Sequence, residues 1–163
     1  RRTSSLLFGT DMTDLFDHVV VPVADPDDAR ATCRALRDRL TGPAVLVHVI
    51  EKAGGGVDKA SVEQREGRAE EIFAAAREEL GSDTPVDTQI HYGTDVSETI
   101  FDAAADEDAS AIVITPRGGS RWVRLLTGDV ALDLVTETDR PVVVLPDVPA
   151  PDTDESTDGG DTT

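Results

Sequence analysis

The chain has a single cysteine, Cys33, so no disulfide can form within it. Nothing in the cysteine content therefore argues for an oxidising compartment. Cys33 lies in a stretch with helical apolar spacing, where we expect a small buried side chain rather than a reactive thiol. Histidine is also scarce, and His18, His48 and His91 form no cluster with metal-ligand spacing.

Long apolar runs are absent as well. No stretch approaches the ~18 residues that a membrane-spanning helix needs, so we expect a soluble, cytoplasmic protein without membrane insertion. The chain begins with two arginines, as twin-arginine export signals do, but the apolar segment that follows is only 6–8. A signal core has ~7–15 residues. Met12 fits a natural start, and residues 1–11 are expected to be a disordered upstream remnant.

Lysine is the third scarcity: the chain has two lysines and 13 arginines against 22 aspartates and 11 glutamates, with a formal net charge of -18. The acids are spread through the predicted helices as well as the C-terminal tail. A surface of this kind stays hydrated in concentrated salt, so we expect a halophilic protein whose self-repulsion is screened in a salt-rich cytoplasm. The same charge excludes nucleic acid as a partner, because phosphate backbones bind basic surfaces.

What the sequence does contain is an alternation of strand-like and helix-like patterns. Four of the five strand-like runs are nearly continuous in apolar residues, as in strands covered on both faces of a parallel sheet. The predicted strands are 18–23, 44–50, 86–92, 111–115 and 141–146, and the predicted helices are 27–40, 59–80, 95–109 and 127–137. This alternation predicts an α/β fold, a doubly wound open parallel sheet with helices on both faces. The domain is expected over 12–148, followed by an acidic disordered tail at 149–163.

One segment differs from the rest of this acidic chain. It reads ITPRGGSRWVRLLTGDVALDLV (114–135) and carries Arg117, Arg121, Arg124 and three glycines between a strand and a helix. Ligands of open α/β sheets bind beyond the carboxyl ends of the strands. Glycines let backbone amides approach an anion, and arginines and a helix N-terminus attract it. The residues thus fit a phosphate-binding loop, and they equally fit glycines that end a strand and begin a helix for structural reasons.

Four motifs, in order and at matching spacing, resemble the universal stress protein family over about residues 17–146. They are VPVAD (21–25), HVI (48–50), RLLTGDVALDLV (124–135) and RPVVVLP (140–146). The resemblance implies five parallel strands in the order 3-2-1-4-5 and a homodimer formed through the last strand, 141–146. It also implies ATP, with Mg²⁺, at the ends of the first and fourth strands, where many members bind it.

Carried over to this chain, the resemblance places the adenosine at Pro22, Val23 and Val49 and the phosphates at the loop after the fourth strand. His91, near the end of the third strand, lies on the same side of the sheet and either contacts the nucleotide or only fills space. The nucleotide-binding candidates are Pro22, Val23, Ala24, Asp25, Val49, Ile114, Thr115, Arg117, Gly118, Gly119, Arg121, Gly128, Asp129 and Val130.

Three positions depart from the family pattern. Ala24 replaces an aspartate, although Asp25 is next to it, and Thr115 replaces the first glycine of the loop. Asp129 replaces a hydroxyl residue, and a carboxylate within ~4 Å of a phosphate oxygen costs about 1–4 kcal/mol at effective dielectric constants of 80 to 20. Nearby arginines, or Mg²⁺ bridging carboxylate and phosphate, would offset this cost. The alternative is that Asp129 caps the helix and the arginines pair with surface acids.

Two other classes of protein share parts of this pattern. A receiver domain also has a threonine after the fourth strand, but it needs an aspartate ending the third and a lysine after the fifth, which are absent. An enzyme needs a catalytic set, and the chain has no G-x-S-x-G elbow and no G-x-x-x-x-G-K-[ST] loop. We therefore expect a non-catalytic stress-response or regulatory protein that binds an adenine nucleotide. The alternative is a dimeric module of the same family that has lost ATP binding and acts through protein partners such as a transporter.

Overall fold

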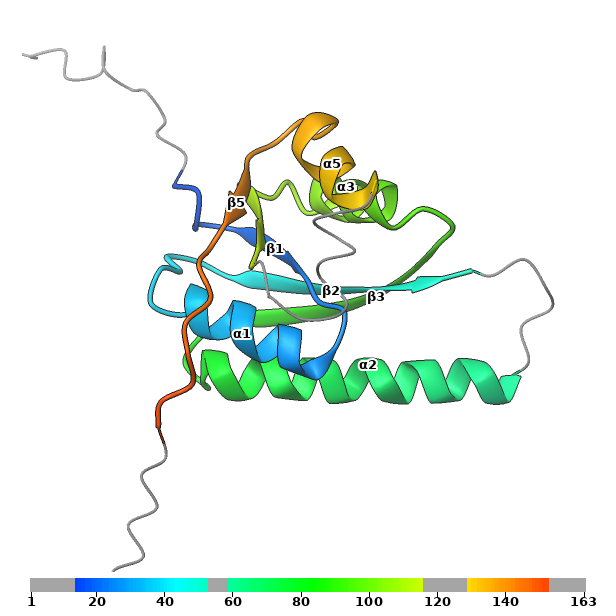
Figure 1. Ribbon diagram of the computed structural model, residues 1–163, viewed down its shortest axis with the longest axis horizontal. Helices are drawn as coiled ribbons and strands as arrows, with labels where there is room; N and C mark the ends of the chain where they lie inside the picture. Colours follow the sequence, from blue (N-terminus) through cyan, green and yellow to red (C-terminus); the bar gives the residue numbers. More distant parts are fainter. Residues whose placement is uncertain (1–13, 53–58, 116–128, 153–163) are drawn as a thin grey trace, which may run out of the picture.

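The computed structural model describes residues 14–52, 59–115 and 129–152. In these ranges the chain forms a five-stranded sheet in which all strands are parallel and follow the order β3-β2-β1-β4-β5 (Figure 1). The elements are β1 (Val19–Pro22), α1 (Pro26–Leu36), β2 (Ala44–Glu51), α2 (Lys59–Leu80), β3 (Val86–Gly93), α3 (Val96–Asp106), β4 (Ala111–Ile114), α5 (Asp129–Thr136) and β5 (Val142–Val144). The predicted fold class and strand order are confirmed.

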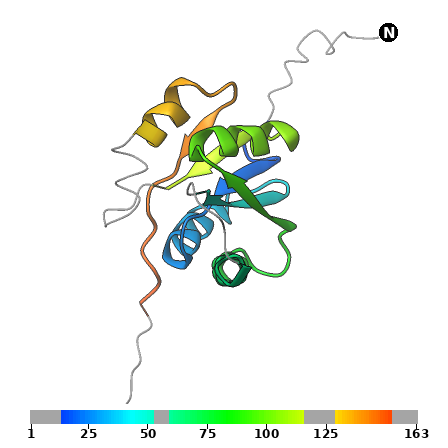
Figure 2. The same cartoon turned by 90° about the vertical axis from the view of Figure 1, so that its right-hand side faces the viewer.

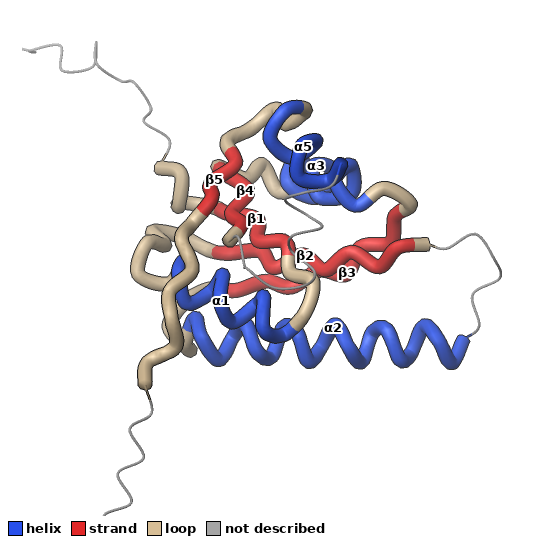
Figure 3. Tube along the Cα trace, in the orientation of Figure 1, coloured by secondary structure: helices blue, strands red, loops and turns tan. Residues whose placement is uncertain are grey.

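The central strands are apolar on both faces because helices cover both sides of the sheet. Every residue of β1 and β4 is buried. Val21 packs in one core with Phe73 of α2, and Val20 packs in the other core with Ile100 of α3. Figure 2 and Figure 3 show α1 and α2 on one face of the sheet and α3 and α5 on the opposite face. Alternate residues of a single strand therefore serve two separate cores.

Aspartate N-caps fix the starts of α1 and α3. Asp25 and Asp95 each have extended backbone geometry and accept the amide three residues later, which satisfies one free donor of the first helical turn. At its other end α1 stops at Leu36 instead of extending to 40, and residues 37–39 form only turns. The chain has to reverse there to enter β2.

The last strand is shorter than predicted. The sequence predicts 141–146, whereas the ladder to β4 is formed by Val142–Val144. Pro141 and Pro146 bracket this segment and lack an N–H donor, so neither can extend the ladder in full. Leu145 still donates its amide to the carbonyl of Ile114, at 2.9 Å. β5 forms an edge of the sheet, where it pairs with β4.

Cys33 is buried, as the sequence predicts. Its side chain is completely inaccessible in the core between the sheet and α2. Burial, followed by the nearby acids Asp28 and Glu79, raises the pKa of the Cys33 thiol to about 12. The thiol therefore stays protonated at physiological pH and acts as a small apolar side chain.

Both predicted terminal segments, 1–11 and most of 149–163, lie outside the described residues. The predicted boundaries of the domain thus stay predictions. Within the described ranges, no helix has the length and apolar character required to cross a bilayer.

Candidate functional site

An apolar pocket lies at the carboxyl ends of the central strands. The hollow encloses about 370 Å³ when the space open to solvent is counted. Its lining consists of Pro22, Val23, Ala24, Val47, Val49, Val96, Ile100, Ile114 and Leu134. Every one of these side chains is apolar, so the pocket suits a flat or apolar group rather than a charged one.

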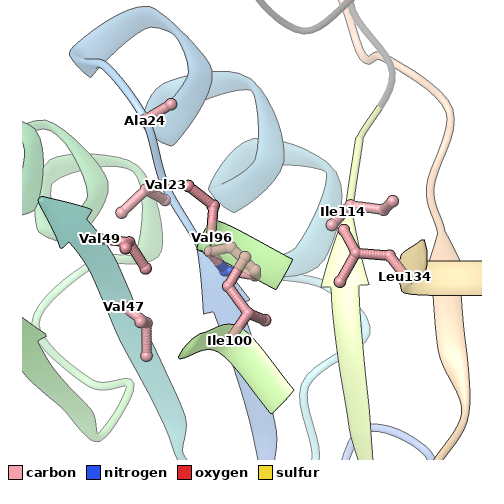
Figure 4. A pocket seen from close by; sticks show the side chains of 9 residues that line it. Val23, Ala24, Val47, Val49, Val96, Ile100, Ile114 and Leu134 are labelled. Atoms are coloured by element: carbon pink, nitrogen blue, oxygen red, sulfur yellow. The ribbon is translucent and has the colours of Figure 1, made fainter. Parts of the chain in front are cut away.

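The pocket has two distinguishable sides. Figure 4 shows Val47 and Val49 of β2 on one side and Ile114 and Leu134 on the other, with residues of α3 between them. The second side is where β4 ends and the connection to α5 begins. A ligand in this pocket can therefore extend either toward β2 and β3 or toward the start of α5.

Strand topology explains why a pocket forms here. β1 is followed by α1 on one face of the sheet, while β4 is followed by α5 on the opposite face. The two connections diverge and leave a crevice above the strand ends. This is the switch point at which open α/β sheets bind their ligands.

Hydrogen bonds on both sides fix the backbone at Val23, in the wall of the pocket. Its amide donates to the carbonyl of Val47 at 2.9 Å, which extends the β1–β2 ladder by one bond. Its carbonyl lies 2.8 Å from Nδ1 of His48. Because a carbonyl only accepts, Nδ1 of His48 carries the proton. His48 thus holds the turn after β1 in place, a role that its position within a strand did not reveal.

Two acids shape the next part of this turn. Asp28 is 1% exposed and its Oδ2 accepts the amide of Ala24 at 2.9 Å. The amide of Asp28 in turn donates to Oδ1 of Asp25, also at 2.9 Å. Asp25 therefore serves as the N-cap of α1, and this oxygen is not free to replace the carboxylate that the family pattern has at position 24.

The walls formed by α3 and α5 are joined by a short polar link. Ser97 is buried, and its hydroxyl donates to Asp95 at 2.8 Å and lies 3.4 Å from Oδ2 of Asp133. The backbone amide of Glu98, and then the Ser97 hydroxyl, lower the pKa of Asp95. The link holds the helices that carry Val96 and Leu134 beside each other.

Thr115 directly follows β4, next to Ile114 of the pocket lining. Its side chain is fully buried, and among the described residues its hydroxyl has no hydrogen-bond partner. A buried hydroxyl without a partner is costly, by about 1–3 kcal/mol. Thr115 therefore has a donor and an acceptor that no other described residue uses, at the position where the sequence predicts the start of the anion-binding loop.

The structure brings together five of the candidates from the sequence, since Pro22, Val23, Ala24, Val49 and Ile114 all line this pocket. Five others lie outside the described residues: Arg117, Gly118, Gly119, Arg121 and Gly128. Asp129 and Val130 begin α5, and the positions of their side chains are also outside what is described. The phosphate-binding half of the predicted site thus stays a prediction.

Sequence reasoning missed four lining residues, namely Val47, Val96, Ile100 and Leu134. All four belong to apolar patterns that indicate core packing, and the sequence alone does not show which core positions border a hollow. Among the described residues, no group of three or more His, Cys, Asp and Glu side chains could hold a metal ion.

Comparison with known proteins gives the family. A search of curated proteins finds no match. Among solved structures, the chain is similar to the universal stress protein from Archaeoglobus fulgidus in complex with dAMP, at 21% identity over 80% of this chain and 98% of that chain, with a TM-score of 0.58. A second is the universal stress protein from Lactobacillus plantarum, with 20% identity, 80% and 97% coverage and a TM-score of 0.59. A third, a universal stress protein in complex with cAMP, has 14% identity, 82% and 98% coverage and a TM-score of 0.56.

These similarities show that the fold is shared. The sequence pattern of the universal stress protein family matches residues 15–146, which is most of the chain. This protein therefore belongs to the universal stress protein family.

Proposed function

We propose that this protein is a non-catalytic stress-response regulator that binds an adenine nucleotide at the ends of β1 and β4. The observation that carries the proposal is the apolar pocket at the switch point between these strands. An adenine ring is flat and largely apolar, so it suits the lining. The phosphates would extend toward the start of α5, because a helix N-terminus attracts anions.

Two solved relatives support this choice of ligand. One similar structure is a complex with dAMP and another is a complex with cAMP. Both ligands contain adenine, and the fold that surrounds them is the fold of this chain. The all-apolar lining also supports a binding role, because none of its side chains can act as a nucleophile or a proton carrier.

Charge is the main obstacle to a nucleotide. The chain has a net charge of -18, and Asp129 stands at the first position of α5. Arg117, Arg121 and Arg124 lie in the same loop sequence and would offset this charge. Mg²⁺ bound between a carboxylate and the phosphates would act in the same direction. We therefore expect binding to depend on Mg²⁺ and to be measurable in concentrated salt, which fits a salt-rich cytoplasm.

Isothermal titration calorimetry with ATP in molar KCl tests this proposal. With Mg²⁺ present we expect saturable binding at one site per chain. Omitting Mg²⁺ should weaken binding at least about tenfold, which corresponds to about 1.4 kcal/mol, within the range of the carboxylate–phosphate repulsion. A flat titration of protein with an intact circular dichroism spectrum would contradict nucleotide binding.

That contrary result would favour a second function, a dimeric module that acts through protein partners. The supporting observation is at the sheet edge, where Val144 of β5 is 50% exposed. An apolar edge strand is prone to pair with another chain, and pairing with a second copy across a two-fold axis would cover it. A transporter is one class of partner for such a dimer.

A further inference from the structure

Three polar side chains form a hydrogen-bonded row along β3 and the end of α3. Gln89 Nε2 lies 2.5 Å from Oε1 of Glu107, the residue that follows α3. Gln89 Oε1 lies 2.8 Å from Nε2 of His91, two residues further along the strand. The other oxygen of Glu107 lies 3.4 Å from Nε2 of His18. The row runs toward the carboxyl end of β3, which is the ligand side of the sheet.

This row determines which nitrogen of His91 carries the proton. A carboxylate has no hydrogen to donate, so the Gln89 amide must turn its NH₂ group toward Glu107. Its carbonyl oxygen then faces His91 and can only accept. Nε2 of His91 must therefore be the N–H donor, which leaves Nδ1 with a free lone pair in the neutral ring. Nδ1 makes no hydrogen bond within the described part of the chain.

Sheet register places His91 beside the pocket. His91 pairs with Val49 in the parallel ladder between β3 and β2. Paired residues of neighbouring strands point to the same face, and Val49 lines the pocket. His91 is half-buried, so part of its surface is open. The register therefore places His91 next to Val49 of the lining, on the side of the pocket opposite the connection from β4 to α5.

We propose that His91 selects adenine over bases that carry an oxygen at the same ring position. The inference rests on the proposed function, because it requires a nucleotide whose phosphates lie toward α5 and whose base lies toward β2. In that orientation the exocyclic amine of adenine donates to Nδ1 of His91. The described lining has no polar side chain of its own, so this nitrogen supplies a selectivity that the pocket wall lacks.

The position of the proton on His91 determines which bases the site prefers. Hypoxanthine and guanine have a carbonyl oxygen where adenine has the amine, and that oxygen would face the lone pair of Nδ1. Two acceptors cannot bond, and a polar group desolvated without a partner loses affinity. Gln89 and Glu107 are positioning residues in this scheme, since they fix the proton on Nε2 and do not reach the ligand.

Calorimetry with AMP and IMP at pH 8 in molar KCl with Mg²⁺ tests the proposal, because histidine side chains are ordinarily neutral at this pH. The two nucleotides differ only along one edge of the base: AMP has an amine on C6 and no hydrogen on N1, whereas IMP has a carbonyl oxygen on C6 and a hydrogen on N1. We expect AMP to bind about tenfold more tightly than IMP, the effect of one hydrogen bond and one mismatch. His91→Phe, which keeps a flat ring without the nitrogens, should reduce this ratio to about one by weakening AMP.

Tyr92→Phe is the matched control. It also removes one hydrogen bond of β3, the contact from the Tyr92 hydroxyl to Glu66, but on the opposite face of the sheet. It should leave the AMP to IMP ratio unchanged. AMP binding with no preference over IMP, or a preference that survives His91→Phe, overturns the role of His91 while leaving the proposed function intact. Absence of AMP binding to the wild-type protein overturns the proposed function itself.

Nitrogen NMR of the free protein tests the tautomer without a ligand. With ¹⁵N-labelled histidine we expect a proton on Nε2 of His91 and none on Nδ1. In Glu107→Gln the amide of Gln89 is no longer held in one orientation, so a mixture of both tautomers should appear. A wild-type spectrum with the proton on Nδ1, or an unchanged Glu107→Gln spectrum, contradicts the proposed row.

Discussion

Gly42→Ala should destabilise the protein by about 3 kcal/mol or more, the upper range for forcing extra atoms into a packed site. Gly42 lies in the turn before β2, and a Cβ built there would lie 1.8 Å from the carbonyl oxygen of Asp17 and 2.8 Å from its carbonyl carbon. The contact is with backbone, so no side-chain rotation relieves it. For a chain of this size we expect the melting temperature to fall by about 10 °C, measured by circular dichroism in molar KCl.

Gly67→Ala is the matched control for this experiment. Gly67 lies in α2, and a Cβ there meets no heavy atom within 4 Å. Alanine is favoured over glycine inside a helix by about 0.8–1 kcal/mol. Replacing glycine by alanine should therefore raise the melting temperature at position 67 and lower it at position 42. A Gly42→Ala protein that melts at or above the wild-type temperature would show that the turn between α1 and β2 is wrongly described.

Val49→Phe should abolish nucleotide binding, with an affinity loss of about 100-fold or more. Val49 lines the pocket on its β2 side, and the larger ring would occupy the space that we assign to the base. A loss of this size corresponds to about 2.8 kcal/mol. Because the ring enters an existing hollow, the fold should persist, which circular dichroism will verify alongside calorimetry with Mg-ATP.

Val135→Phe controls for the change of side chain. Val135 lies on α5 with 62% of its surface exposed and does not line the pocket. The same substitution there should leave nucleotide affinity unchanged. If folded Val49→Phe bound ATP as the wild-type protein does, the nucleotide would have to bind elsewhere.

Local sequence patterns predicted the fold well because the apolar pattern of each strand and helix matches the burial of that element in the structure. The apolar runs that become β1 and β4 indicate strands covered on both faces, and all their residues are buried. Alternation with helices then restricts the topology to a doubly wound sheet. The strand order itself came from the resemblance to the family. The ends of elements were less predictable, as the early end of α1 at Leu36 shows.

The candidate site was only partly predictable because much of it depends on contacts between distant residues. His48 and Val23 are 25 positions apart and meet because β1 and β2 are neighbours. Ser97 and Asp133 are 36 positions apart and meet only once two helices cover the same face. Val23, His48 and Asp133 belong to family motifs, but those motifs do not indicate either contact. By contrast, Val23 was found from the sequence because it belongs to a short family motif.

The three acids after β1 show a second kind of contact that the sequence does not predict. The sequence indicates that acids at 25, 27 and 28 favour a helix N-terminus, and the cap at Asp25 agrees with this. It does not indicate that Asp28 turns inward and accepts the amide of Ala24. Whether Asp28 is buried depends on how α1 is rotated about its axis relative to the sheet. Packing sets this rotation, and the amino-acid composition does not.

Methyl NMR most directly tests whether the apolar pocket receives the adenine ring. In protein labelled at the methyl groups of valine, leucine and isoleucine, AMP with Mg²⁺ should shift the signals of Val23, Val47, Val49, Ile114 and Leu134. The adenine protons should show nuclear Overhauser contacts to the methyl groups of Val49. If saturating AMP leaves these signals in place, or shifts only the methyl groups of surface residues such as Val135, the pocket at the ends of β1 and β4 is not the nucleotide site.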